Sequence, residues 1–357
     1  MAKIEFKNVG HSYDINTEKP VYALEPFSLS WDNGGRYALL GPSGCGKTTM
    51  LNIMSGLITP SEGSVYFDDQ EITSIRTEQR NIAQVFQFPV IYSTMSVYEN
   101  LAFPLKCRNY DDSKIKQKVY EVADILNLNS FLDAAAKELT ADQKQLISLG
   151  RGLVRENVAA VLMDEPLTVI DPDLKFKLRL KLKEINSKYQ TTLIYVTHDQ
   201  NEAMTFAEKI IVMDSGRIVQ SGTSKELFER PRTSFVAYFI GTPAMNMYSC
   251  YIENNELVLG SSKIKIDTNL AQITSEQLKV GIRSEFIELT DKPCKNSIHT
   301  KINLDEDFGN YRLLTCVFEN LEIKVKINRD QSIPSENPYL ILPQSRLCLY
   351  ENDILVN

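Results

Sequence analysis

The stretch that decides the fold class runs from residue 36 to residue 48. It reads Arg36-Tyr37-Ala38-Leu39-Leu40-Gly41-Pro42-Ser43-Gly44-Cys45-Gly46-Lys47-Thr48. An apolar, strand-like run opens it, and a helical pattern follows over Thr49 to Met54. A Gly-x4-Gly-Lys-Thr pattern in that context predicts a loop whose backbone N–H groups, with the helix N-terminus, surround a phosphate. The alternative is a glycine-rich turn that matches by chance, and the flanking strand and helix argue against it.

Within this loop the side chains have separate expected roles. We expect Lys47 to reach the β- and γ-phosphates of a nucleotide, and the Thr48 hydroxyl to be a Mg²⁺ ligand. The predicted nucleotide-binding residues are the loop and the threonine after it: Gly41, Pro42, Ser43, Gly44, Cys45, Gly46, Lys47, Thr48 and Thr49.

Two further apolar runs end in polar residues. Val158 to Met163 is followed by Asp164 and Glu165, and Leu193 to Thr197 is followed by His198. Taken alone, the first is a weak signal and the second is more often a capping or core histidine. Beside a phosphate loop, Asp164 suits the Mg²⁺ shell and Glu165 suits a general base that polarises water. His198 then suits a donor to the γ-phosphate.

Length and composition limit the remaining possibilities. A chain of 357 residues predicts two domains, since one domain typically has roughly 100–200 residues. The net charge of −7 disfavours a nucleic-acid partner. The longest apolar run, Val158 to Met163, is far shorter than the roughly 18 residues that span a bilayer, and the N-terminus has no secretion-signal pattern. These features predict a soluble protein that stays in the cytoplasm.

The six cysteines are scattered along the chain with no pair at metal-ligand spacing. This pattern predicts reduced, mostly buried thiols, and we expect neither a zinc site nor a structural disulfide.

The pattern of apolar and polar residues changes near residue 235. Before it, strand-like runs alternate with helical patterns, which is typical of an α/β domain with a largely parallel sheet. After it, short alternating segments such as Tyr248–Ile252 and Lys263–Ile266 predict a small all-β module. The boundary is expected around Glu229–Thr233.

Two further helices are predicted in the first part. Leu174 to Lys183 alternates like a strand, but Asp171-Pro172-Asp173 is a helix start, and apolar residues continue at helical spacing to Tyr189. The second helix is expected over Ser113 to Leu128, with one apolar face that comprises Ile115, Val119, Val122 and Leu126.

These elements, in this order, resemble the ATPase subunits of ABC transporters. Tyr13 lies where that family has an aromatic residue that stacks on adenine, and Gln87 matches the loop glutamine that senses Mg²⁺ and links to the transmembrane subunits. Thr168–Asp171 matches the loop that communicates between two ATP sites, and Gln145–Val154 resembles the helix after the family signature.

The resemblance implies a fold, a site and ligands. The fold is an α/β P-loop NTPase cassette over residues 1–235, a RecA-like core with a helical subdomain at about 88–157. A small all-β, OB-like (TOBE-type) domain follows over 236–357. Glu165, His198 and Gln87 would be catalytic, and Tyr13 would join the phosphate loop in binding ATP. Thr48, Gln87 and Asp164 would hold Mg²⁺.

Within the family, the chain is most similar to carbohydrate-type importers for maltose, glycerol-3-phosphate or glycerol. The matching segments are Gly41–Thr49, Val97–Leu101, Tyr195–Gln200, Phe239–Gly241 and Val280–Glu285. The resemblance is specific over residues 1–240 and looser beyond. It implies two transmembrane permease subunits docked around Phe86–Leu105, an extracytoplasmic solute-binding protein, and a peripheral place on the cytoplasmic face of the cell membrane. Selectivity lies in those other subunits, so the solute stays open, with glycerol or a related polyol favoured.

One motif departs from the family. The signature Leu-Ser-Gly-Gly-Gln, which holds the γ-phosphate of an ATP bound to the other subunit, is Leu139-Thr140-Ala141-Asp142-Gln143 here. At about 4 Å from a phosphate oxygen, Asp142 would cost about 4 kcal/mol per charge pair at an effective dielectric near 20. If Asp142 instead turns outward, it favours the helix N-terminus by about 0.3–1 kcal/mol. We favour an impaired signature.

An impaired signature beside an intact phosphate loop argues against a homodimer, because a homodimer would place two impaired signatures against two intact phosphate loops. We therefore expect a heterodimer with a paralogous ATPase subunit, in which this chain hydrolyses ATP and energises an importer of a sugar, polyol or glycerol-type solute. The alternatives are a regulatory subunit with little turnover of its own and a soluble ABC ATPase outside transport. The C-terminal β-domain either regulates the dimer or extends its interface.

Overall fold

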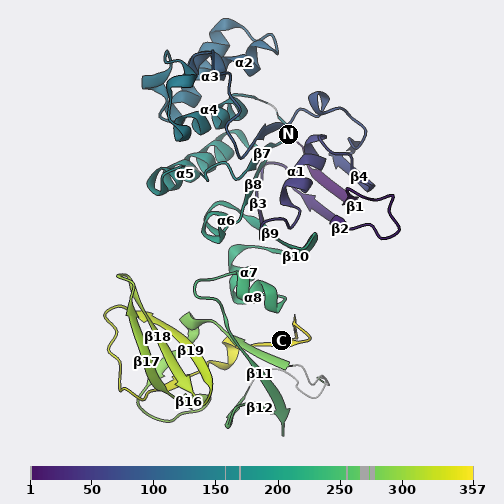
Figure 1. Ribbon diagram of the computed structural model, residues 1–357. Coiled ribbons are helices and arrows are strands. Elements are labelled where there is room, and N and C mark those ends of the chain that lie inside the picture. The colour runs from purple at the N-terminus through teal and green to yellow at the C-terminus, as the bar shows by residue number, and fades with distance from the viewer. Residues whose placement is uncertain are drawn as a thin grey trace. The chain divides into compact units, whose positions relative to one another are not determined.

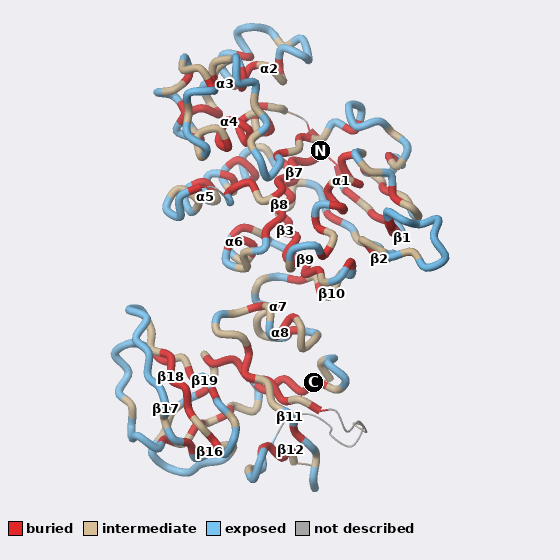
Figure 2. Tube along the Cα trace, in the orientation of Figure 1, coloured by how far each residue is buried: buried red, intermediate tan, exposed pale blue. Residues whose placement is uncertain are grey.

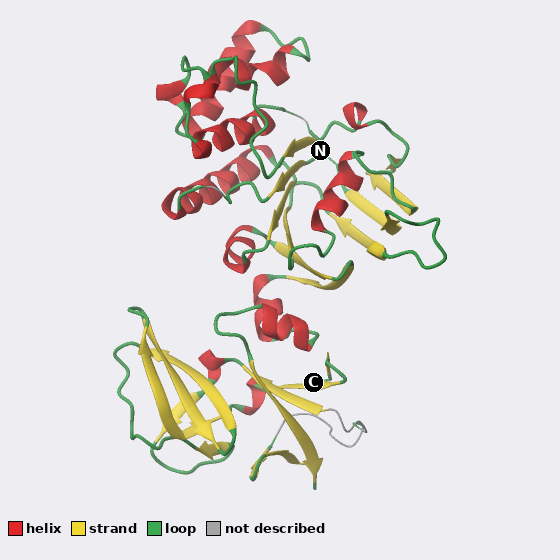
Figure 3. Ribbon diagram, viewed as in Figure 1, coloured by secondary structure: helices red, strands yellow, loops and turns green. Residues whose placement is uncertain are grey.

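The computed structural model describes residues 2–156, 158–168, 170–254, 256–265, 273 and 278–356. The chain divides into two compact units, Met1–Ser224 and Lys225–Asn357 (Figure 1). Helices and strands are mixed in the first unit, and strands dominate the second (Figure 3). The predicted boundary at residue 235 falls within the second of these units, in its second short helix.

The first unit is built on a central sheet with strand order β10-β9-β3-β8-β7-β6. The strands are β3 (Arg36–Leu40), β6 (Ala83–Val85), β7 (Val161–Asp164), β8 (Leu193–Thr197), β9 (Lys209–Asp214) and β10 (Arg217–Gly222). The pairs β3–β8, β3–β9, β6–β7 and β7–β8 are parallel, and only β10 runs antiparallel to its neighbour. Strands buried on both faces read as continuous apolar runs, and β3, β7 and β8 coincide with such runs in the sequence. Figure 2 shows these three strands as the buried centre of the unit.

A second, antiparallel sheet has the order β2-β1-β4-β5. Its strands are β1 (Ile4–Ser12), β2 (Tyr22–Trp31), β4 (Glu62–Phe67) and β5 (Gln70–Glu71). Helix α1 (Lys47–Ser55) packs with this sheet in one core cluster, into which it buries Met50, Leu51, Ile53 and Met54. That burial fixes the direction in which the helix N-terminus points.

The helical part of the first unit comprises α2 (Val97–Lys106), α3 (Asp112–Ile125) and α4 (Ala141–Leu153), with short 3-10 turns at Asn129–Phe131 and Ala136–Glu138. These elements fall within the predicted range 88–157, whose last residue, Asn157, is outside the described residues. Helix α3 ends before the expected Leu128, because Leu126 already leaves the helical conformation as the C-cap. Ile115, Val119 and Val122 form its buried face as predicted.

Helix α5 (Pro172–Tyr189) confirms that the alternating stretch is helical. Asp171 caps it by accepting a hydrogen bond from the Asp173 N–H at 3.0 Å, and Pro172 opens it. Leu178, Leu182 and Ile185 are buried against the core. Helix α6 (Gln200–Phe206) follows β8 directly.

The second unit is an all-β module after two short helices, α7 (Ser224–Glu229) and α8 (Ser234–Phe239). The three sheets have the orders β13-β12-β11-β14-β21-β22, β15-β20-β16 and β17-β18-β19. The strands of the first are β11 (Asn246–Glu253), β12 (Glu256–Leu259), β13 (Ser262–Ile264), β14 (Leu278–Ile282), β21 (Cys348–Glu351) and β22 (Ile354–Leu355). Those of the other two are β15 (Glu288–Thr290), β16 (Ser297–His299), β17 (Lys301–Asp307), β18 (Tyr311–Phe318), β19 (Leu321–Asn328) and β20 (Tyr339–Ile341).

Every pairing in the second unit is antiparallel among the described residues. The predicted all-β class is therefore confirmed. The predicted strand Tyr248–Ile252 lies within β11, and Lys263–Ile266 begins in β13, with Ile266 outside the described residues.

Arg283 organises the start of this unit. Its buried guanidinium donates to the carbonyls of Phe228 (3.0 Å), Ala237 (2.9 Å) and Ile240, so it ties β14 to the ends of both short helices. Burial lowers the pKa of Arg283 to about 10, which leaves it charged near neutral pH.

The cysteines are free thiols, as predicted. Cys45, Cys250, Cys316 and Cys348 are buried, whereas Cys107 and Cys294 are exposed. Within the described parts of the chain, none of the helices combines the length and apolar character that crossing a membrane requires.

Candidate functional site

The phosphate loop connects β3 to α1 through backbone that requires glycine. Gly46 has φ +98°, and a Cβ at this position would lie 2.5 Å from the Ala23 carbonyl oxygen. A Cβ on Gly41 would lie 2.3 Å from the Met213 carbonyl oxygen. Both positions therefore exclude larger residues for steric reasons that arise from β2 and β9. No side chain caps the N-terminus of α1, so its first N–H groups face the loop.

Lys47 is buried beneath the loop that precedes it. Its Nζ atom donates to the Gly41 carbonyl at 2.9 Å and to the Pro42 carbonyl at 2.8 Å. Cys45 Sγ lies 3.8 Å from the same Nζ. Burial raises the pKa of the Cys45 thiol, so the thiol stays neutral and the ammonium remains the charge at this point. The lysine thus holds a cation directly against the backbone that would surround a phosphate.

Thr48 and Asp164 meet at the end of β7. The Thr48 hydroxyl donates to Asp164 Oδ2 at 3.0 Å. Burial is the main cause that raises the pKa of Asp164, and the hydrogen bond from Thr48 opposes it. A hydroxyl beside a carboxylate is an oxygen donor set of the kind that Mg²⁺ accepts, together with phosphate oxygens and water. Over the described residues, no group of three or more His, Cys, Asp or Glu side chains could hold a metal ion alone.

Three other side chains contact the carboxylate of Glu165. Its Oε1 atom lies 3.0 Å from His198 Nδ1, and its Oε2 atom accepts from Gln87 Nε2 at 3.4 Å and from Thr168 Oγ1 at 3.3 Å. Its backbone N–H donates to the Val196 carbonyl at 3.0 Å, and its φ is +44°. A non-glycine residue at positive φ is uncommon and persists where the surrounding structure holds it. The structure thus brings the three predicted catalytic residues to one point.

Tyr13 follows β1 directly and contacts the first turn of α1. Its hydroxyl is 3.2 Å from Thr49 Oγ1, and its ring meets that of His11 edge-on at 4.7 Å between centroids. The residue is 69% exposed, so one face of the ring is open to solvent. Tyr13 is therefore connected to the phosphate loop helix through Thr49, a contact that the sequence did not indicate.

The degenerate signature forms the N-terminus of α4. The Thr140 N–H donates to Gln143 Oε1 at 3.0 Å, and the Thr140 hydroxyl donates to Asp142 Oδ1. Leu139 packs against the helical core cluster, while Ala141 is exposed. The Asp142 carboxylate therefore does not point freely into solvent. It accepts the hydrogen bond of the one hydroxyl that the motif retains, so that hydroxyl is not available to donate to a phosphate.

The loop after β7 is described at Thr168, Ile170 and Asp171; Val169 lies outside the described residues. Thr168 is the part that reaches the site, through the contact with Glu165 given above.

Comparisons with known proteins agree with this geometry. The ABC transporter family model matches residues 24–168. The sn-glycerol-3-phosphate import ATP-binding protein UgpC of Psychromonas ingrahamii is 35% identical over 333 residues, which are 93% of this chain and 86% of that protein. The oligosaccharides import ATP-binding protein MsmX of Bacillus subtilis is 34% identical over 345 residues, which are 94% of this chain and 93% of that protein.

The chain belongs to the ABC transporter family. It is an ATP-hydrolysing subunit of the transporter type, and the first unit carries its ATP-binding fold. Among solved structures, the ATP-binding cassette MJ0796, a dimer in a post-hydrolysis state bound to ADP and Pi, is 29% identical with a TM-score of 0.56. The match covers 62% of this chain and 98% of that one. The predictions of family, fold class and ATPase activity are thereby confirmed.

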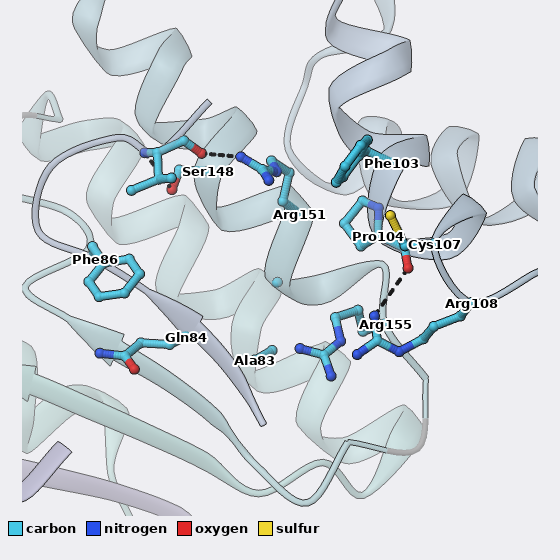
Figure 4. A pocket seen from close by; sticks show the side chains of 12 residues that line it. Ala83, Gln84, Phe86, Phe103, Pro104, Cys107, Arg108, Ser148, Arg151 and Arg155 are labelled. Carbon is cyan, nitrogen blue, oxygen red and sulfur yellow. Dashed lines mark hydrogen bonds between the residues drawn. The ribbon is translucent and has the colours of Figure 1, made fainter. Parts of the chain in front are cut away.

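This ABC ATPase also has a surface groove of about 300 Å³ beside the Gln87 loop (Figure 4). Its charged lining consists of Arg108, Arg151 and Arg155, and its apolar lining includes Phe86 and Val90. Burial, and the nearby charge of Arg108, lower the pKa of Arg155 to about 10, so it too stays charged near neutral pH. Four of its lining residues (Phe86, Val90, Phe103 and Pro104) lie in the segment predicted to contact membrane subunits, whereas its three arginines lie outside that segment.

The sequence did not indicate two contacts of the site, that of Thr168 with Glu165 and that of Thr140 with Asp142. The first could have been anticipated, since the loop that carries Thr168 directly follows β7. The second depends on a side-chain rotamer, which has no signal in sequence spacing.

Proposed function

We propose that this chain hydrolyses ATP at the site built on its own phosphate loop and thereby drives an importer. The observation that carries the proposal is the convergence of His198, Gln87 and Thr168 on Glu165, next to the Thr48–Asp164 pair. A carboxylate held from three sides beside a phosphate site is placed to polarise an attacking water.

The remaining residues receive roles from their chemistry. The loop N–H groups and Lys47 bind the phosphates, and Tyr13 contacts the adenine with its exposed ring face. Thr48, Asp164 and Gln87 would hold Mg²⁺, which neutralises phosphate charge when it is bound. Glu165 polarises water as the general base, and His198 donates a hydrogen bond to the γ-phosphate.

The transported solute is proposed from the relatives. The names of those proteins refer to the import of sn-glycerol-3-phosphate and of oligosaccharides. This chain has comparable length and matches them over both of its units, which supports a sugar, polyol or glycerol-type solute. Selectivity would lie in the other subunits of the importer.

The arginine-lined groove supports a membrane partner. Three guanidinium groups beside exposed apolar side chains fit an amphipathic segment that carries at least one carboxylate. We assign this segment to the two transmembrane permease subunits. The chain would then work as a peripheral protein on the cytoplasmic face of the cell membrane, in a complex that also includes an extracytoplasmic solute-binding protein.

The signature supports a heterodimer. Asp142 accepts the hydrogen bond that the Thr140 hydroxyl donates, and it adds a negative charge where a γ-phosphate would approach. A second, paralogous ATPase subunit with a normal signature would complete the site on this chain's phosphate loop, and residues 139–143 would serve the partner's site weakly. The β-domain, assigned to residues 236–357, would be an accessory part that regulates or extends the dimer.

The test is ATPase activity in the purified membrane complex, measured against a panel of sugars, polyols and phosphoglycerol. We expect one solute class, presented by the binding protein, to stimulate hydrolysis, and a homodimer of this chain to be much slower than the mixed complex. Brisk ATP hydrolysis by the homodimer would overturn the proposal of a heterodimer. Unchanged transport with Glu165→Gln would favour a regulatory subunit, and failure to assemble with any permease would favour a soluble ABC ATPase.

A further inference from the structure

Glu202 is a buried carboxylate to which the proposed mechanism gives no role. It lies in the first turn of α6 and is 7% exposed. Its Oε2 atom accepts hydrogen bonds from Thr197 Oγ1 at 2.9 Å and from the Tyr195 hydroxyl at 3.0 Å. Burial and the Glu202 charge raise the pKa of Tyr195 well above its ordinary value, so this phenol remains a donor. One carboxylate oxygen is thus fully engaged with β8.

The other oxygen faces α5. Glu202 Oε1 lies 3.5 Å from Lys175 Nζ and 3.9 Å from Arg179 Nη1. Both cations are largely shielded from solvent, since their side chains are 23% and 14% exposed. A shielded ion pair is strongly disturbed when one partner is removed, because the remaining charge is left uncompensated. Glu202 therefore links α5 to β8 and α6 through charge as well as hydrogen bonds.

The contacts on the β8 side enclose the turn that presents His198. The Asp199 N–H donates to Thr197 Oγ1 at 3.0 Å, the same oxygen whose hydrogen goes to Glu202. Asp199 Oδ1 in turn accepts from the Glu202 N–H at 3.4 Å. His198 thus lies between two residues that are both fixed to Glu202.

The contacts on the α5 side reach the loop that presents Thr168. Helix α5 begins at Pro172, and the Lys175 N–H donates to the Asp171 carbonyl at 2.8 Å in its first turn. That loop delivers Thr168 Oγ1 to Glu165 Oε2, while His198 contacts Oε1. The two segments that Glu202 connects therefore approach the same carboxylate from different elements.

We propose that Glu202 is a positioning residue for hydrolysis. It holds the His198 turn and the Thr168 loop in fixed relation, so that Glu165 keeps its orientation when ATP is bound. The inference rests on the proposed hydrolysis at this site. Because Glu202 contacts neither the phosphate loop nor Tyr13, its loss impairs turnover and spares ATP binding.

Glu202→Gln tests this in the assembled transporter, since glutamine keeps the shape and one acceptor oxygen but removes the charge that pairs with Lys175 and Arg179. The matched control is Glu184→Gln, because Glu184 is exposed on α5 and its ion pair with Lys181 involves none of the residues that contact Glu202. We expect kcat, measured well below the melting temperatures of both proteins, to fall about tenfold or more, with KM for ATP unchanged within about twofold. The melting temperature should fall as well, because Lys175 and Arg179 lose their partner charge. The control should keep wild-type values.

A second variant separates positioning from general stability. Lys175→Met keeps the carboxylate and removes one contact to α5, so it should lower kcat in the same way but less. Combined with Glu202→Gln, it should add little, because both changes break one connection. Wild-type kcat in both single variants, or a loss of kcat that disappears well below the melting temperature, would overturn the proposal. A wild-type complex without hydrolysis would instead refute the proposed function itself.

Discussion

Nδ1 of His198 lies 3.0 Å from Oε1 of Glu165, although the two residues are 33 positions apart in the chain. They meet because β7 and β8 are adjacent parallel strands, with Asp164 paired to Val196, so both strands end at the same edge of the sheet. Any residue placed just after each strand is delivered to the same point. The contact is therefore a direct consequence of the strand order and register.

Glu165→Gln should stop turnover while ATP still binds. Glutamine can occupy the same space, but it cannot take a proton from water, so we expect kcat to fall by at least about 100-fold. Affinity for ATP should remain within about threefold of wild type, by fluorescence titration with a nucleotide analogue. Glu78→Gln, in an exposed 3-10 turn, is the control and should hydrolyse normally. Residual activity close to wild type would show that Glu165 is not the base.

Asp164 makes the stability of the nucleotide-free chain depend on pH. Its folded pKa is raised, so its contribution to stability is fully present below the ordinary aspartate pKa and is lost as the pH rises through the raised value. Asp164→Asn removes this dependence. Without nucleotide, the variant should melt at a higher temperature than wild type at pH 7.5, and this difference should shrink as the pH is lowered.

When Mg²⁺ and ATP are bound, wild type should instead melt at a higher temperature than Asp164→Asn. The wild-type chain gains stability by binding them through its carboxylate, whereas Asp164→Asn should gain much less. Differential scanning calorimetry at several pH values, with and without Mg·ATP, measures both effects. Equal nucleotide stabilisation of the two proteins would contradict the assignment of Asp164 as a ligand.

The site could be predicted from sequence wherever one local pattern determined one element. The phosphate loop, the two apolar runs and their terminal residues each carried such a pattern, and parallel strand ends necessarily converge. Glu202 carried none, because a single carboxylate early in a helix looks like an exposed residue. Its burial depends on Lys175 and Arg179 from α5, whose alternating sequence even favoured a strand. Side-chain pairing between separate elements is tertiary information.

Val90→Asp should release the membrane partner and preserve ATP binding. Val90 lines the arginine groove and is 51% exposed, so the change does not open the core. The added carboxylate would neutralise part of the arginine cluster and repel the acidic segment that we expect there. Co-purification of the permease subunits should fall several-fold. Val21→Asp, at a 74% exposed position away from the groove, should co-purify normally.

Arg283→Met should destabilise the second unit. The buried guanidinium donates to carbonyls of Phe228, Ala237 and Ile240, and methionine leaves these acceptors without that donor. We expect a loss of roughly 3–5 kcal/mol, as for other buried charged groups with several partners. Limited proteolysis should cleave the second unit first. Arg329→Met, which removes an exposed pair with Asp307, is the control and should cost less than about 1 kcal/mol.

Asp142→Gly with Ala141→Gly should restore the signature. In wild type, the Thr140 hydroxyl is held by Asp142, and a carboxylate at about 4 Å from a phosphate oxygen costs about 4 kcal/mol at an effective dielectric near 20. The double change removes the charge, frees the hydroxyl and restores two glycines. We expect a homodimer of this variant to hydrolyse ATP at least about tenfold faster than a wild-type homodimer, in steady-state assays with purified protein.

Asp142→Asn separates the two causes of impairment. Asparagine keeps an oxygen that can accept from Thr140 but carries no charge. If repulsion dominates, this variant should recover most of the activity of the glycine variant. If the occupied hydroxyl dominates, it should remain close to wild type, and Thr140→Ala in the glycine background should abolish the gain. A homodimer that stays slow with both glycines in place would show that the signature is not what limits it, and the argument for a heterodimer would lose its chemical basis.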